Sequence, residues 1–209
     1  MKGIYAMNIK EIYILNRALD GQDIPFLPAY KSLDISELTI DSIKEGMVRK
    51  GLLVSHSEFS NFGILIASRL LKYKKAKKHI KLNNLYIGML NDTESILIQW
   101  NPPLQEYSID LIINISAVNQ IAERYEFLTE NLDEPDEQPK ELSFDELNTR
   151  YNLSSHSFRL STLSGRDRTD EIYFKSDNKL YIYDFMTHVL QPINRQNIII
   201  MLSERMYIS

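Results

Sequence analysis

The sequence predicts an α+β protein in which an antiparallel sheet, built from two strand-meander-plus-helix halves with a pseudo-two-fold relationship, is flanked by helices. Two observations predict it: apolar spacing changes from helical to alternating at residue 82, and the order of strands then helix returns after an acidic segment. With 209 residues and 44% hydrophobic content, the chain is long enough to bury a sizeable core. We expect a single domain over 1–209, with an N-terminal half 1–128, an acidic linker 129–141 and a C-terminal half 142–209.

Two helices are predicted in the first fifty residues. Asn8 and Glu11 have the spacing of a capping box, and Asp20-Gly21 ends the helix that they begin. The second helix has an apolar stripe and a glycine where a C′ residue stops a helix: Ile40, Ile43, Met47 and Gly51. A short strand is expected at Leu52 to Val54.

A third helix, capped by Ser60, is predicted to run through the lysine-rich stretch LLKYKKAKKHIK at 70–81. Its apolar face comprises Phe62, Ile66, Leu70, Tyr73, Ala76 and Ile80. The rest of the circumference carries Lys72, Lys74, Lys75, Lys77, Lys78 and Lys81. We interpret these lysines as a solvated helical face, because a chain with net charge -4 and pI near 5.6 repels phosphate backbones as a whole.

The middle of the chain predicts a three-stranded meander followed by a helix and a linker. The alternating residues are Leu85, Ile87 and Met89, then Ile96, Ile98 and Trp100, then Tyr107, Ile109, Leu111 and Ile113. An amphipathic helix from Ser116 carries Val118, Ile121, Ala122, Tyr125 and Leu128. TENLDEPDEQPKE is acidic, contains prolines and has no apolar period, which indicates an exposed linker.

The C-terminal half repeats this order. Ser143 and Glu146 again have capping-box spacing, for a short helix. Three strand-like runs follow, SFRLSTL, DEIYFKS and LYIYDFM. We expect Pro192 to open a last helix with Ile198, Ile199, Leu202 and Met206 on one face.

The chain shows no constellation typical of an enzyme or a cofactor site. There is no cysteine, and the four histidines, His56, His79, His156 and His188, lack partners at metal-ligand spacing. We therefore predict no catalytic residue, no metal and no cofactor. The N-terminus lacks a signal-peptide apolar core and no stretch nears eighteen apolar residues, so we expect a cytoplasmic protein without direct membrane insertion.

Residues 42–73, SIKEGMVRKGLLVSHSEFSNFGILIASRLLKY, resemble the end of a winged-helix domain. That resemblance implies a DNA-binding transcriptional regulator. The candidate recognition helix, 40–50, offers Lys44, Arg49 and Lys50 against Asp41 and Glu45, and we do not favour a nucleic-acid partner on this balance.

A second resemblance covers nearly the whole chain. NIKEIYILNRALDGQDIPFLP is similar to the opening of the EspG family of type VII secretion chaperones. The helix ending in RKGLL, the long helix, the meander and the final SFRLSTLSGRDRTD segment with LYIYDF keep that family's order. The resemblance implies a cytosolic, non-catalytic protein whose central sheet and C-terminal helical part hold a helical-bundle secretion substrate before export. An antitoxin or immunity-type binder is a further option.

A chaperone needs an exposed apolar anchor, and the turn after the second meander strand offers one. We predict partner contacts at Trp100, Pro102, Pro103 and Leu104, with Tyr173 or Tyr181 from the second meander. The alternative is that Trp100 closes the core at the end of its strand.

Overall fold

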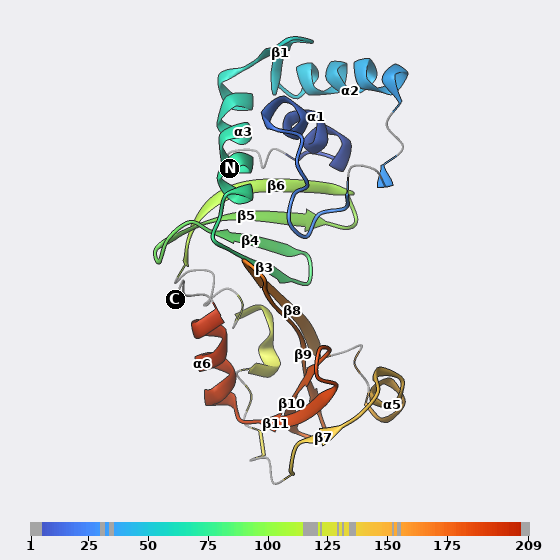
Figure 1. Cartoon of the computed structure of the whole chain (residues 1–209), viewed down its shortest axis with the longest axis vertical. Coiled ribbons are helices and arrows are strands. Elements are labelled where there is room, and N and C mark those ends of the chain that lie inside the picture. The colour runs from blue at the N-terminus through green and yellow to red at the C-terminus, as the bar shows by residue number, and fades with distance from the viewer. Residues whose placement is uncertain are drawn as a thin grey trace.

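The fold is taken from a computed structural model of the chain. The structure describes residues 6–29, 32–33, 36–114, 121, 123–128, 130, 132–133, 137–151, 153 and 156–205. Within these ranges the protein is α+β, with helices flanking a large antiparallel sheet (Figure 1).

Three helices and a small hairpin precede the sheet. They are α1 (Ile9–Leu19), α2 (Glu37–Arg49), β1 (Leu53–Ser55), β2 (Glu58–Phe59) and α3 (Asn61–Lys74). The predicted caps are confirmed: Asn8 and Glu11 form the capping box of α1, and Ser60 accepts a hydrogen bond from Gly63 N–H at the start of α3. Gly51 has a φ of +72°, the left-handed conformation that ends α2.

Nine strands form one sheet in the order β6-β5-β4-β3-β8-β9-β10-β11-β7. The N-terminal strands are β3 (Lys78–Leu82), β4 (Leu85–Met89), β5 (Glu94–Asn101) and β6 (Glu106–Ile113). The C-terminal strands are β7 (Lys140–Glu141), β8 (Ser157–Ser164), β9 (Asp167–Ser176), β10 (Lys179–Asp184) and β11 (Val189–Ile193). Each meander contributes its first strand, β3 or β8, to the centre of the sheet. A symmetry axis between the halves stays a prediction.

The centre of the sheet is held by a charged cluster as well as by the β3–β8 ladder. The Arg159 guanidinium donates two hydrogen bonds to Asp170, at 2.8 and 2.6 Å, and lies 4.2 Å from the ring centroid of Phe185. Burial by itself raises the pKa of Asp170, but hydrogen bonds from Arg159 and Ser161 outweigh it and hold the pKa below its ordinary value. The cluster therefore fixes β8, β9 and the turn after β10 in one arrangement.

Three buried clusters divide the core between the two sheet faces. The first lies between α1–α3 and β4–β6, the arrangement seen at the top of Figure 1. The second lies under α6 (Arg195–Arg205) and the 3-10 helix η2 (Glu126–Leu128). The third lies under α5 (Phe144–Arg150), whose capping box at Ser143 and Glu146 is confirmed. Alternation along β10 separates the last two, because Leu180 and Ile182 join the α6 cluster while Tyr181 and Tyr183 join the α5 cluster.

The predicted continuation of the third helix through the lysine run is wrong. Helix α3 ends at Lys74, and Lys78–Leu82 is the strand β3, paired with β4 and β8. The end of α3 packs closely on β4, where a Cβ added at Gly88 would lie 2.7 Å from Tyr73 Cδ2. The lysines therefore do not share one solvated helical face: Lys72, Lys75 and Lys77 are exposed, whereas the Lys74 side chain is only 5% exposed.

The last helix also begins later than predicted. Pro192 lies in β11, opposite Tyr181, and Asn194 caps α6 by accepting a hydrogen bond from Asn197 N–H at 2.9 Å. The last two residues of the predicted acidic linker, Lys140 and Glu141, form β7, which pairs with β11 at the edge of the sheet. The prediction of a helix from Ser116 falls largely on 115–120 and 122, outside the described residues; η2 buries Phe127 and Leu128.

His79, in β3, makes folding stability depend on pH. Burial lowers the pKa of His79 below 6.5, and the hydrogen bond from its Nε2 to the Tyr73 carbonyl oxygen, at 2.8 Å, only partly offsets this. As the pH falls below 6.5, His79 takes up a proton in the unfolded chain but not in the folded chain. Stability should therefore fall with pH from about pH 7.5 to 5.5, by at most about 1.4 kcal/mol per unit from this group.

Urea unfolding across this range measures the effect. His79→Gln should flatten the dependence relative to the natural protein. An unchanged slope in His79→Gln contradicts the assignment.

Candidate functional site

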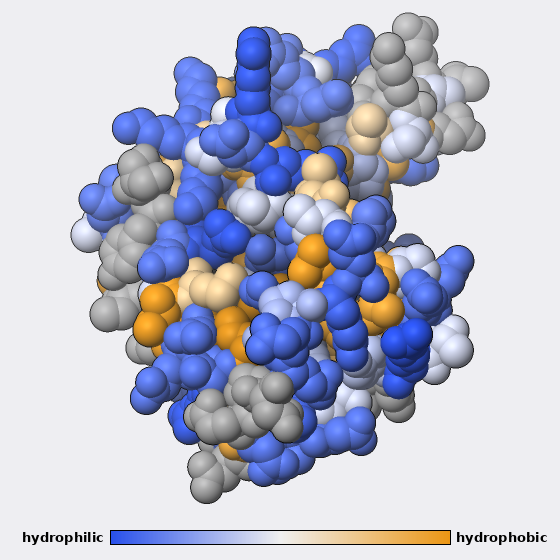
Figure 2. Space-filling view, turned by 60° about the horizontal axis from the view of Figure 1, so that its bottom comes forward, coloured by the Kyte–Doolittle hydropathy of each residue, from blue (hydrophilic) through white to orange (hydrophobic). Residues whose placement is uncertain are grey.

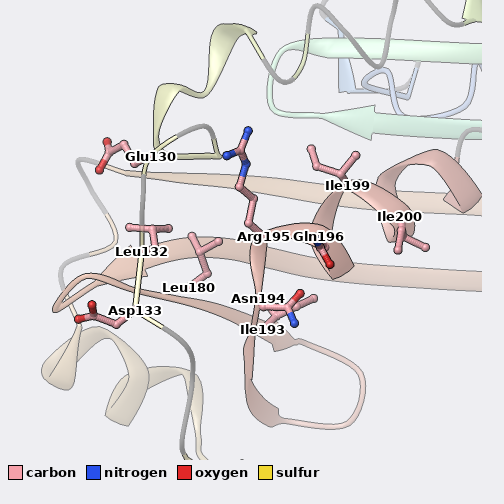
Figure 3. Close-up of a pocket in the computed structure, with 10 residues that line it drawn as sticks. All are labelled: Glu130, Leu132, Asp133, Leu180, Ile193, Asn194, Arg195, Gln196, Ile199 and Ile200. Atoms are coloured by element: carbon pink, nitrogen blue, oxygen red, sulfur yellow. The ribbon is translucent and has the colours of Figure 1, made fainter.

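A groove beside α6 is the candidate site among the described residues. One part of the groove has a cavity volume of about 660 Å³ and lies between α6, β10, the end of β11 and the segment that precedes β7. It is lined by Glu130, Leu132, Asp133, Leu180, Ile193, Asn194, Arg195, Gln196, Ile199 and Ile200. Figure 3 shows Arg195 extending from the start of α6 between Glu130 and Ile199.

A second hollow of about 330 Å³ adjoins the first and shares Ile193 and Ile200 with it. It reaches Pro192 and Met201 and is bounded by Pro139, which is exposed. We call the two hollows together the α6 groove. Ile200 is 53% exposed, and Figure 2 shows apolar side chains reaching the surface among mainly hydrophilic ones on this side of the molecule.

The α6 groove has an apolar floor and a charged rim. Leu132 packs against the core cluster that buries Leu180 and Ile193. At the rim Glu130 pairs with Lys175, and Glu137 accepts a hydrogen bond from Tyr181 at 2.9 Å. That hydrogen bond holds the pKa of Glu137 below its ordinary value, together with the hydrogen bond from Lys140 and the positive charges of Lys140 and Lys179. The Glu137 carboxylate is thus ionised at neutral pH. An apolar floor with a polar rim is the anatomy of a protein-binding surface.

The sequence contains a signal for this groove that periodicity alone did not single out. Ile198, Ile199 and Ile200 are consecutive, and successive helical residues are separated by about 100° around the axis. One buried face cannot take all three. Ile198 is fully buried, Ile199 is partly buried and Ile200 is exposed, so the apolar surface extends from the core into the groove.

The predicted contact turn lies elsewhere, at the β5–β6 hairpin. Pro102, Pro103 and Leu104 are exposed, with Leu104 at 62%. Trp100 is partly buried against the N-terminal cluster, and its ring centroid lies 4.5 Å from that of Tyr107. Trp100 therefore has a packing role in the fold, while a partner contact at this hairpin stays a prediction.

Tyr173 and Tyr181, the other predicted contact residues, lie away from this hairpin in β9 and β10. Both side chains are buried, at 0% and 3% exposure, and their hydroxyls donate to Glu171 and Glu137. Strand β10 lies five positions from β5 in the sheet, about 24 Å at the usual strand spacing. The alternation that placed them in strands does not say which strands become neighbours. A partner contact at Tyr173 or Tyr181 would require these buried side chains to become exposed.

Metal sites and membrane-spanning helices were also sought in the part of the chain that the structure describes. No group of three or more His, Asp or Glu side chains in it is placed to hold a metal ion. None of its helices combines the length and apolar character needed to cross a membrane.

Fold and groove together define an α+β protein whose nine-stranded antiparallel sheet carries helices on both faces and an apolar groove along its last described helix. The chain belongs to the family described as a domain of unknown function (DUF5081), whose model matches residues 1–209. No curated protein matches the chain significantly.

Proposed function

We propose that this chain is a cytosolic chaperone of type VII secretion that binds a helical-bundle secretion substrate before export. The observation that carries the proposal is the α6 groove with the exposed Ile200, because it lies in the C-terminal helical part. This is the part to which the resemblance to the EspG family assigns substrate binding. The proposed role is binding, without a catalytic step.

The form of the α6 groove favours a packed apolar tip over an added strand. Beyond Val189 and Leu190, which pair with β7, the outer side of β11 carries Pro192, a residue without a backbone N–H. A partner that inserts aliphatic side chains from a helix end is compatible with the apolar floor and needs no ladder of main-chain hydrogen bonds. The charged rim then supplies the polar boundary.

A winged-helix regulator is the alternative function, with α2 as recognition helix and β1–β2 as the wing. Lys50 is one of the three cations available to it. Its Nζ lies 2.9 Å from Glu11 Oε2 and 3.6 Å from Glu106 Oε1. Because two carboxylates hold this lysine, the helix has less positive charge to offer a phosphate backbone, and we rank the chaperone first.

The proposal is tested by placing a charge on the floor of the α6 groove. Ile200→Glu should weaken capture of a helical-bundle type VII secretion substrate by about tenfold or more, because a carboxylate would be buried against an apolar surface. Ile64→Glu is the matched control: Ile64 lies on α3 and is 55% exposed, close to the 53% of Ile200. The Ile64→Glu variant should bind the substrate with the affinity of the natural protein.

Leu104→Glu separates the α6 groove from the surface predicted at the hairpin. If capture fails in Leu104→Glu and survives in Ile200→Glu, the contact is at the β5–β6 hairpin and the groove assignment is wrong. If both variants bind normally, neither surface is the substrate site. Thermal melts of all three variants establish that each is folded before binding is compared.

A further inference from the structure

A separate pocket lies in the N-terminal half, between α1, α2 and the β1–β2 hairpin. Its volume is about 480 Å³, within the range of small-molecule sites. The floor is apolar, with Ile14 and Leu53 buried and Phe59 partly buried against the N-terminal cluster. We call it the hairpin pocket, and neither the resemblance nor the proposed chaperone function uses it.

The hairpin is held in place beside α3, so the pocket is part of the packed structure. Ser60 Oγ donates a hydrogen bond of 2.6 Å to the Gly51 carbonyl, and Ser60 N–H donates one of 3.2 Å to the Leu52 carbonyl. Gly63 lacks a side chain where the Leu52 carbonyl approaches α3. These contacts join both ends of the hairpin to the helix and fix Leu53 and Phe59 at the floor.

The rim of the hairpin pocket carries an excess of positive charge. Arg17 from α1 and Lys44 from α2 line it, and neither side chain has a hydrogen bond or ion pair to another described residue. Glu58 is the one carboxylate in the lining. His56 also lines the pocket, and its Nδ1 lies 3.7 Å from a carboxylate oxygen of Asp41, which does not line it. Two permanent cations against one carboxylate, over an apolar floor, complement a ligand with an apolar body and a negative charge.

We propose that the hairpin pocket binds a small apolar carboxylate, with the hydrocarbon part on Ile14, Leu53 and Phe59 and the carboxylate between Arg17 and Lys44. Exposed ion pairs contribute modestly, so the charge should improve binding by about three- to tenfold over an uncharged or cationic molecule of the same size. The apolar floor supplies the remainder of the affinity.

Two probes of equal chain length and opposite charge test this proposal on the full chain: decanoate and decylammonium, each below its micelle concentration. Decanoate should bind about three- to tenfold more tightly, and the methyl NMR signals of Ile14, Ile40 and Leu53 should shift on titration. In Arg17→Glu/Lys44→Glu the preference should reverse. Arg17→Gln/Lys44→Gln, a milder change that leaves Glu58 as the one charged group of the rim, should bind decanoate no more tightly than decylammonium.

Lys72→Glu/Lys77→Glu is the matched control, because it changes the net charge equally at exposed positions outside the pocket. It should keep the preference for decanoate. Equal binding of both probes to the natural protein overturns the proposal, as does loss of preference in the control. Methyl shifts confined to other parts of the protein also overturn it. None of these results depends on the secretion substrate, so the chaperone proposal stands or falls separately.

Discussion

Gly63→Ala should destabilise the fold by about 3 kcal/mol, at the upper end of the usual cost of overpacking. A Cβ at this position would lie 1.9 Å from the carbonyl oxygen of Leu52 and 3.0 Å from its carbonyl carbon. Both are backbone atoms, so no side chain can rotate away. The start of α3 must move off the β1–β2 hairpin, and the Ser60 contacts that join them are lost.

Chemical denaturation compared with Gly46→Ala measures this cost. Gly46 lies inside α2, and a Cβ there would be 3.7 Å from Glu11 Oε1, an ordinary contact. Alanine in a helix interior is favoured over glycine by about 0.5–1 kcal/mol, so this control should be neutral or stabilising. A Gly63→Ala variant as stable as the natural protein contradicts the packing of the hairpin on α3.

Lys74→Met should lower stability by about 1–3 kcal/mol, although the sequence places Lys74 among exposed lysines. Its Nζ donates a hydrogen bond of 2.6 Å to Asn16 Oδ1 and forms an ion pair with Asp20. Asn16 is 2% exposed, and the variant leaves its amide oxygen buried without this donor. The hydrogen bond from Lys74 also holds the pKa of Asp20 below its ordinary value.

Lys75→Met supplies the comparison, because Lys75 is exposed and adjacent in sequence. It should unfold at the same denaturant concentration as the natural protein, while Lys74→Met unfolds earlier. Equal midpoints for the two variants would mean that the end of α3 is not tied to the end of α1 in solution.

Local signals in the sequence were sufficient for the helix starts. Each helix start is capped by a side chain that accepts a hydrogen bond from the backbone N–H three positions later; the capping residues are Asn8, Ser60 and Ser143. A segment of four residues therefore contains the whole cap. Strands β4, β5 and β6 and strands β8, β9 and β10 were similarly predicted from alternation. The type of each of these elements is therefore a local property of the chain.

The errors arose where distant chain segments decide the structure. Lys78–Leu82 suits a helix by composition, but pairing with β4 and β8 on either side makes it a strand. Pro192 was predicted to start a helix because proline is common there. Its actual place in β11, opposite Tyr181, depends on pairing with β10, which the local sequence does not show. The α6 groove brings Leu132 and Leu180 together with Ile193, Ile199 and Ile200. Their proximity follows from the order of the strands in the sheet, which periodicity does not contain.

The central claim is that the chain holds a secretion substrate, and light scattering coupled to size-exclusion chromatography tests it most directly. The full chain is mixed at about 10 µM with a helical-bundle type VII secretion substrate from the same organism, a concentration that detects micromolar affinity. The account predicts a complex of fixed stoichiometry that Ile200→Glu prevents and Ile64→Glu preserves. Separate elution of the two proteins, together with salt-dependent binding of the chain to duplex DNA, would contradict it.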